Sequence, residues 1–112
     1  MFRKLHWICL LSFLLAGCSA DSHKEQPPAQ KNVEIKIDNF TFTPASVTIA
    51  PGTMVTWINH DDVPHTATST TKAFASTALD TDEKFSFTFT KTGTFPYYCA
   101  VHPHMTGQII VK

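Results

Sequence analysis

The alternation of apolar and polar residues that starts at Val33 constrains this chain most strongly. It is clearest in residues 84–90, KFSFTFT, where three phenylalanines alternate with serine and threonine. Successive side chains of a β-strand point to opposite faces, so this stretch would have one apolar face. Such a face has to be covered by a second layer of structure. The pattern therefore predicts a layered β fold.

Other short stretches have the same character and are separated by turn residues: 33–38, 46–50, 54–59, 94–100 and 107–112. Pro51 and Gly52 suit the two central positions of a type II turn, and Gly93 ends a short hairpin loop. No segment has a helical period over eleven residues, although residues 76–83 could hold one helical turn. Several short strands at this spacing predict an all-β sandwich in residues 33–112.

The N-terminal seventeen residues have the order of an export signal. A short basic segment, MFRK, precedes the apolar stretch 5–17, which is shorter than the roughly 20 residues that span a bilayer. The next motif, LAGC at residues 15–18, resembles the lipobox of bacterial lipoproteins. That resemblance implies removal of residues 1–17 and attachment of lipid to Cys18, and two or more acyl chains give stable anchoring. An uncleaved apolar segment with a chance cysteine is the alternative.

Residues 19–32, SADSHKEQPPAQKN, contain no aliphatic residue larger than alanine and include a Pro-Pro pair. This composition predicts a flexible linker. The expected organisation is therefore a signal peptide at 1–17, a lipidated cysteine with linker at 18–32, and one domain at 33–112. The formal net charge is 0, so the chain has no general attraction to nucleic acid, and no nucleic-acid partner is expected.

The chain has three cysteines, and export would leave one of them free. Cys9 would leave with the signal peptide and Cys18 would carry lipid, so Cys99 would have no disulfide partner in an oxidising compartment. Cys99 is then either a buried inert thiol or a thiolate held by a metal.

The segment CAVHPHM, residues 99–105, contains three metal donors at intervals of three residues: Cys99, His102 and Met105. A tight loop between two strands can turn these three side chains toward one point. A fourth donor has to come from elsewhere, and His65 is the candidate. His60, which lies beside two aspartates, is expected to be solvated.

Two imidazoles and a thiolate with a weak axial thioether are the donor set of blue copper sites. Such a set leaves no open position for a substrate, so it favours one-electron transfer over catalysis. Zinc is the main rival metal. Structural zinc sites usually draw on paired cysteines, which this chain lacks, although zinc could occupy the site when copper is scarce.

Two long stretches, GTMVTWINHDDVPHT and GTFPYYCAVHPHMTGQIIVK, resemble the signature segments of the plastocyanin and azurin cupredoxins. The chain is most similar to amicyanin, which shares the C-x₂-H-x₂-M spacing. The resemblance implies a Greek-key β-sandwich of about seven to eight strands. It also implies one type 1 copper ion held by four residues: His65, Cys99, His102 and Met105.

The resemblance further implies a role for residues around the ligands. Asn59 would join the His65 loop to the Cys99 loop by hydrogen bonds, and a backbone N–H would donate to the thiolate sulfur. Two positions depart from the family pattern. Thr66 stands where asparagine is common, and His104 stands where amicyanin-like loops often carry an apolar residue.

The sequence as a whole predicts a membrane-anchored, monomeric cupredoxin that carries single electrons and faces the periplasm or the cell exterior. It is not expected to be an enzyme. Electrons would enter and leave through His102, and Pro103 with neighbouring apolar residues would form a docking patch for transient redox partners. The alternative is a copper-binding module that buffers or delivers copper. Such sites are more open and often rich in methionine.

Overall fold

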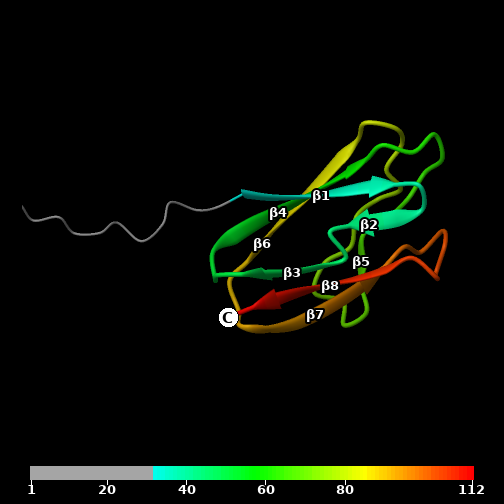
Figure 1. The fold of residues 1–112 in the computed structure, drawn as a ribbon. Helices are drawn as coiled ribbons and strands as arrows, with labels where there is room; N and C mark the ends of the chain where they lie inside the picture. The colour runs from blue at the N-terminus through cyan, green and yellow to red at the C-terminus, as the bar shows by residue number, and fades with distance from the viewer. Residues whose placement is uncertain (1–31) are drawn as a thin grey trace, which may run out of the picture.

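The computed structural model describes residues 32–112, which form two four-stranded β-sheets packed face to face (Figure 1). The strands are β1 (Asn32–Asp38), β2 (Thr41–Thr43), β3 (Ser46–Ile49), β4 (Thr53–Asn59), β5 (Thr68–Ser69), β6 (Lys84–Phe89), β7 (Gly93–Tyr98) and β8 (Thr106–Val111). This part of the chain has no helix that is long and apolar enough to cross a membrane. The predicted signal peptide and Cys18 lie outside the described residues.

The two sheets have strand orders β2-β1-β4-β6 and β3-β8-β7-β5. Two pairs of strands, β1 with β4 and β3 with β8, are parallel, and the other neighbours are antiparallel. Parallel strands cannot be joined by a tight hairpin, so the chain crosses repeatedly from one sheet to the other. The expected all-β sandwich is confirmed, with eight strands in two mixed sheets.

The core lies between the two sheets and contains the apolar face that the sequence pattern predicts. In β6 the three alternating phenylalanines turn toward the core, and the last of them, Phe89, is 1% exposed. Trp57 of β4 stacks on Phe85 with ring centroids 5.7 Å apart. The other face of the same pair of strands is polar, where the hydroxyls of Thr56 and Ser86 lie 2.7 Å apart. The alternation therefore fixes which face of β6 is buried.

The type II turn at residues 50–53 is confirmed. The Thr53 N–H donates to the Ala50 carbonyl at 3.2 Å, and Gly52 has φ 90°, a conformation that side chains with a β-carbon rarely adopt. The turn connects β3 in one sheet to β4 in the other.

The short strands β2 and β5 were not anticipated, because three and two residues are too few to show an alternating pattern. Residues 76–83 do not form the helical turn that their sequence could have held. Leu79 instead pairs in an extended conformation with His65, and each backbone N–H donates to the other residue's carbonyl at 2.7 and 3.1 Å. Long-range pairing has overridden the local preference of this segment.

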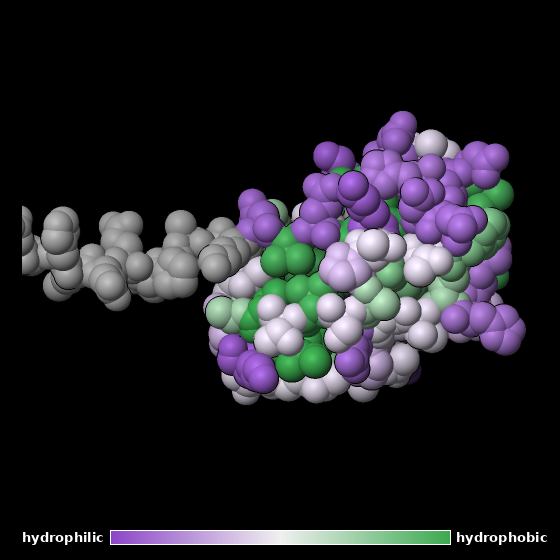
Figure 2. All heavy atoms as spheres, viewed as in Figure 1, coloured by the Kyte–Doolittle hydropathy of each residue, from purple (hydrophilic) through white to green (hydrophobic). Residues whose placement is uncertain are grey.

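Hydrophilic residues gather over the loops between β4 and β6, at the upper right of Figure 2. Asp80, Asp82 and Glu83 in these loops are all exposed. They add acidic charge to this part of the surface.

Gly107 of β8 pairs directly with Tyr97 of β7, and its lack of a side chain makes room for the tyrosine ring. A β-carbon at position 107 would lie 2.5 Å from both Cζ and Oη of Tyr97. The tyrosine itself is buried, and burial raises the pKa of Tyr97 to about 12, which keeps the phenol neutral at ordinary pH.

We predict that Gly107→Ala lowers the free energy of unfolding by about 1–3 kcal/mol, because the new methyl group overpacks the core. Urea denaturation of the purified protein measures this loss. Tyr97→Ala removes the clash, so the same glycine substitution should cost much less in the Tyr97→Ala background. An equal cost in both backgrounds would show that the ring is not the cause.

Candidate metal centre

The predicted donors lie on loops that meet at one end of the sandwich. His65 lies in the connection from β4 to β5, Cys99 directly follows β7, and His102 and Met105 lie in the loop that leads into β8. These connections lie together at the right-hand end in Figure 1, away from the C-terminus. Residues 65 and 99 are far apart in the sequence, so the sandwich topology brings them together.

Three of the predicted donors converge on a small triangle. Cys99 Sγ lies 3.6 Å from His65 Nδ1 and 3.9 Å from His102 Nδ1, and the two Nδ1 atoms are 3.2 Å apart. His65 and Cys99 are each 0% exposed, whereas His102 is half-buried. Among the His, Cys, Asp and Glu side chains of residues 32–112, these three form the group that is arranged to hold a metal ion.

The spacing of these atoms fits one metal ion. Bonds of about 2.05 Å to imidazole and 2.3 Å to thiolate, arranged in a plane, place the donor atoms about 3.5–3.8 Å apart. The three observed distances, 3.2, 3.6 and 3.9 Å, lie close to this range. The donors combine one soft thiolate with two imidazoles, which is the combination that suits copper.

Met105 is buried beside the triangle, and hydrogen bonds fix its position in the loop. The Met105 N–H donates to the His102 carbonyl at 2.9 Å, and the Cys99 N–H donates to the Met105 carbonyl at 3.0 Å. Met105 is 5% exposed and belongs to the same apolar cluster as Cys99. The loop therefore closes on itself and places its methionine in the core next to the cysteine, so all four predicted donors can serve one copper ion.

Asn59 does not have the role that the sequence predicted for it. Its side-chain amide donates to the carbonyls of Val63 and Leu79 at 2.9 and 2.8 Å, and its oxygen accepts from the Asp61 N–H at 2.9 Å. Asn59 therefore shapes the loop that precedes His65 and ties it to the segment at Leu79. It makes no hydrogen bond to the Cys99 loop.

Thr66 makes the connection that was expected of Asn59. Its backbone N–H donates to Cys99 Sγ at 3.4 Å, which confirms the predicted N–H bond to the sulfur. Its hydroxyl accepts the Ala100 N–H at 2.7 Å. One residue therefore holds both the sulfur and the backbone that follows it, and the threonine replaces the asparagine that is common in the family.

Asp61 contacts a predicted donor, a role that the sequence did not indicate. Its carboxylate lies 2.7 Å from His65 Nε2 and also accepts the backbone N–H groups of Asn39 and Phe40 at 2.7 and 2.9 Å. With Nε2 donating to the carboxylate, Nδ1 of His65 turns its lone pair toward Cys99. The only sequence signal is an aspartate four residues before the histidine.

The pKa of Asp61 reflects these contacts. Burial by itself would raise the pKa of the carboxyl group, but hydrogen bonds from the Phe40 and Asn39 amides and from His65 bring the pKa below its ordinary value. The carboxylate is therefore charged and can orient the imidazole beside it. His60, by contrast, is exposed, as expected.

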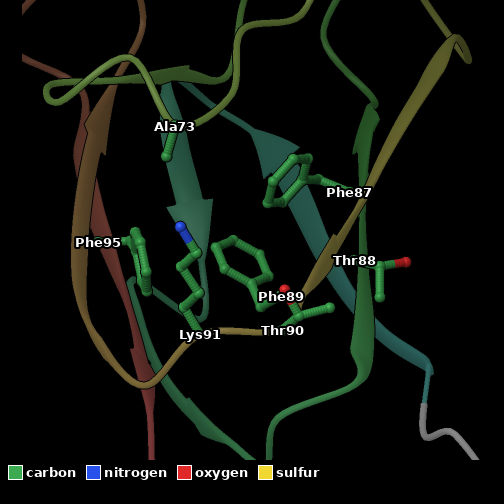
Figure 3. A pocket seen from close by; sticks show the side chains of 7 residues that line it. All are labelled: Ala73, Phe87, Thr88, Phe89, Thr90, Lys91 and Phe95. Atoms are coloured by element: carbon green, nitrogen blue, oxygen red, sulfur yellow. The ribbon is translucent and has the colours of Figure 1, made fainter.

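An apolar pocket of about 210 Å³ lies elsewhere, beside the hairpin between β6 and β7. Its lining comprises Ala73, Phe87, Thr88, Phe89, Thr90, Lys91 and Phe95. The phenylalanine rings surround the pocket, and the Lys91 side chain extends between Phe89 and Phe95 (Figure 3). None of these side chains is a usual copper ligand, so the pocket is separate from the metal centre.

Known proteins resemble this chain in both sequence and structure. The sequence profile of the cupredoxin-like domain matches residues 7–111. Amicyanin-alpha from Methylorubrum extorquens is 29% identical over 103 residues, which cover 88% of this chain and 85% of that protein. The family match covers almost the whole chain, and the relative is matched over most of its own length.

Two solved structures show the same fold. The purple cupredoxin from Nitrosopumilus maritimus superposes with a TM-score of 0.68 at 32% identity, over 71% of this chain and 99% of that one. The copper-containing nitrite reductase from Thermus scotoductus also superposes with a TM-score of 0.68, at 29% identity. The match covers 72% of this chain but 22% of the reductase, so the chain corresponds to a small part of that enzyme.

We predict that Thr66→Val destabilises the link between the two ligand loops. Valine has nearly the same shape but cannot accept the Ala100 N–H, so the free energy of unfolding should fall by about 1 kcal/mol. Thr66→Ser keeps the hydroxyl and is the matched control. Urea denaturation compares the two variants. A valine variant as stable as the parent would show that this hydrogen bond does not hold the loops together.

Proposed function

The chain belongs to the family of cupredoxin-like domains, and on this basis we propose that it is a one-electron carrier with a single type 1 copper centre. The ligands would be His65, Cys99, His102 and Met105. The observation that carries the proposal is the triangle of one thiolate and two imidazoles, closed to solvent on the His65 and Cys99 side and half-open at His102. The similarity to amicyanin supports the same function.

A bound copper ion supplies a Cu(II)/Cu(I) couple that exchanges one electron. The protein's part is to hold the ligands still, because a carrier reacts fastest when little has to move. Asp61 fixes the His65 ring, and Thr66 fixes the Cys99 sulfur and the following amide. These hydrogen bonds hold the two deepest donors in place, and the charge-assisted contact from Asp61 is the strongest kind among them.

The burial of the donors favours a carrier over an enzyme. Neither His65 nor Cys99 has any exposed surface, so a substrate has no route to the triangle from their side. Catalytic metal sites keep a coordination position open for the substrate or for water. The match to the nitrite reductase that shares the fold covers 22% of that enzyme, so the similarity extends to a small part of it.

His102 is the proposed point of electron entry and exit. In residues 32–112 the large hydrophobic side chains that are strongly exposed are Phe40, at 49%, and Val101, at 47%. Val101 precedes His102, and the Phe40 ring contacts the His102 ring with centroids 5.0 Å apart. Pro103 is also exposed. Together they would form an apolar docking patch for redox proteins, whose transient complexes bury less than about 1,200 Å².

We also propose that the mature protein is anchored to the membrane by lipid on Cys18 and faces the periplasm or the cell exterior. The order of a basic segment, an apolar segment and the LAGC motif supports this location. Palmitate fed to cells that express the full chain should label the protein, and Cys18→Ser should abolish the label. Equal labelling of the variant would remove Cys18 as the lipid site.

The proposed copper centre is tested by the visible absorption spectrum of residues 19–112 loaded with Cu(II). Thiolate bound to copper should give an intense band in the red region that ascorbate bleaches, because the ion takes up one electron. Cys99→Ser, which keeps the size of the side chain but removes the sulfur, should lack the band. A pale complex that loses copper to a mild chelator would instead indicate copper buffering or delivery.

A further inference from the structure

The turn between β1 and β2 has a backbone conformation that its sequence does not favour. Asn39 and Phe40 are its two central residues and have φ angles of 51° and 57°. This is the left-handed geometry of a tight hairpin turn, in which glycine, asparagine and aspartate are preferred. Asn39 suits it, but a bulky aromatic residue such as Phe40 is disfavoured there. Something outside the turn has to hold Phe40 in place.

Asp61 supplies that restraint from the loop before His65. Its two carboxylate oxygens accept one N–H each from the turn, Oδ1 from Asn39 and Oδ2 from Phe40. Oδ2 is also the atom that lies 2.7 Å from His65 Nε2. One carboxylate therefore ties the strained turn directly to a ligand of the metal centre. The Asp61 side chain is only 11% exposed.

The restrained turn places the Phe40 ring against both ligand imidazoles. Its centroid lies 5.3 Å from that of His65 and 5.0 Å from that of His102, with interplanar angles of 88° and 90°. These are edge-to-face contacts, which are favourable for aromatic rings. Half of the phenylalanine surface nevertheless remains exposed, so burial of Phe40 in the core does not explain its position.

We propose that Phe40 is a positioning residue that restrains the imidazoles of His65 and His102 and covers the approach to the metal. Asp61 holds Phe40 in this position through its hydrogen bonds to the turn. The unfavourable backbone at Phe40 is then retained because the ring is needed at this place. The inference rests on the proposed metal centre for its effect on copper. Its effect on the histidine rings is independent of any metal.

Two substitutions separate this role from a purely structural one. Phe40→Gly and Phe40→Asn both remove the ring and both suit the left-handed backbone. We therefore expect the unfolding midpoint of the metal-free protein to stay the same or to rise. If Phe40 served only to stabilise the fold, the same substitutions would lower that midpoint.

The control is Val101→Ala. Val101 is the other strongly exposed apolar side chain, and its replacement removes apolar surface from the same end of the protein while Phe40 stays in contact with the imidazoles.

Two measurements report on the imidazoles. In the metal-free protein, NMR signals of the ring protons of His65 and His102 should shift when the aromatic ring is removed and stay unchanged in Val101→Ala. In the Cu(II)-loaded protein, excess EDTA should remove copper at least tenfold faster from the Phe40 variants than from the parent. The control should remain within twofold of the parent.

The outcomes distinguish the two proposals. Unchanged imidazole signals together with copper loss within twofold of the parent would overturn the role of Phe40. If Val101→Ala had the same effect on the imidazole signals as the Phe40 substitutions, the role of Phe40 would also be overturned, because simple exposure would then be the cause. If the parent itself binds no copper, the proposed function fails, and the imidazole signals alone decide whether Phe40 positions the rings.

Discussion

The contact between the His65 segment and the Cys99 loop is the constraint on which the metal centre depends. These two segments belong to different parts of the chain, and a single residue, Thr66, joins them through its amide and its hydroxyl. The strands β7 and β8 bring Cys99 to the end of one sheet, and β4 leads toward His65 from the other. The donor triangle exists only because the two sheets are stacked with these ends together.

A second set of contacts orients the histidine in this arrangement. Leu79 pairs with the backbone of His65, Asn59 fixes the loop before it, and Asp61 holds the far side of its ring. His65 is thereby restrained on its backbone and on its side chain. This degree of restraint is consistent with a site that has to present the same geometry to two oxidation states of a metal.

The half-exposed edge of His102 is surrounded by residues of different origin. Val101 and Pro103 come from the ligand loop itself, whereas Phe40 comes from a hairpin turn more than sixty residues earlier. The turn meets the ligand loop through the contact of the Phe40 ring with His102, and Asp61 links the same turn to His65. A change in the β1–β2 turn can therefore reach the metal centre, although no residue of that turn is a ligand.

The sequence by itself determined the longer strand-forming segments, the turn at Pro51 and Gly52, and the donors, because alternation, turn preference and donor spacing are local properties. The tertiary structure alone decided which residues support the donors. Asp61, Thr66 and Phe40 act on partners that are remote in the sequence. Asn59 bonds to its own loop and to Leu79 instead of to the Cys99 loop. Hydrogen bonds between segments depend on how two sheets stack, and no local pattern of residues records that arrangement.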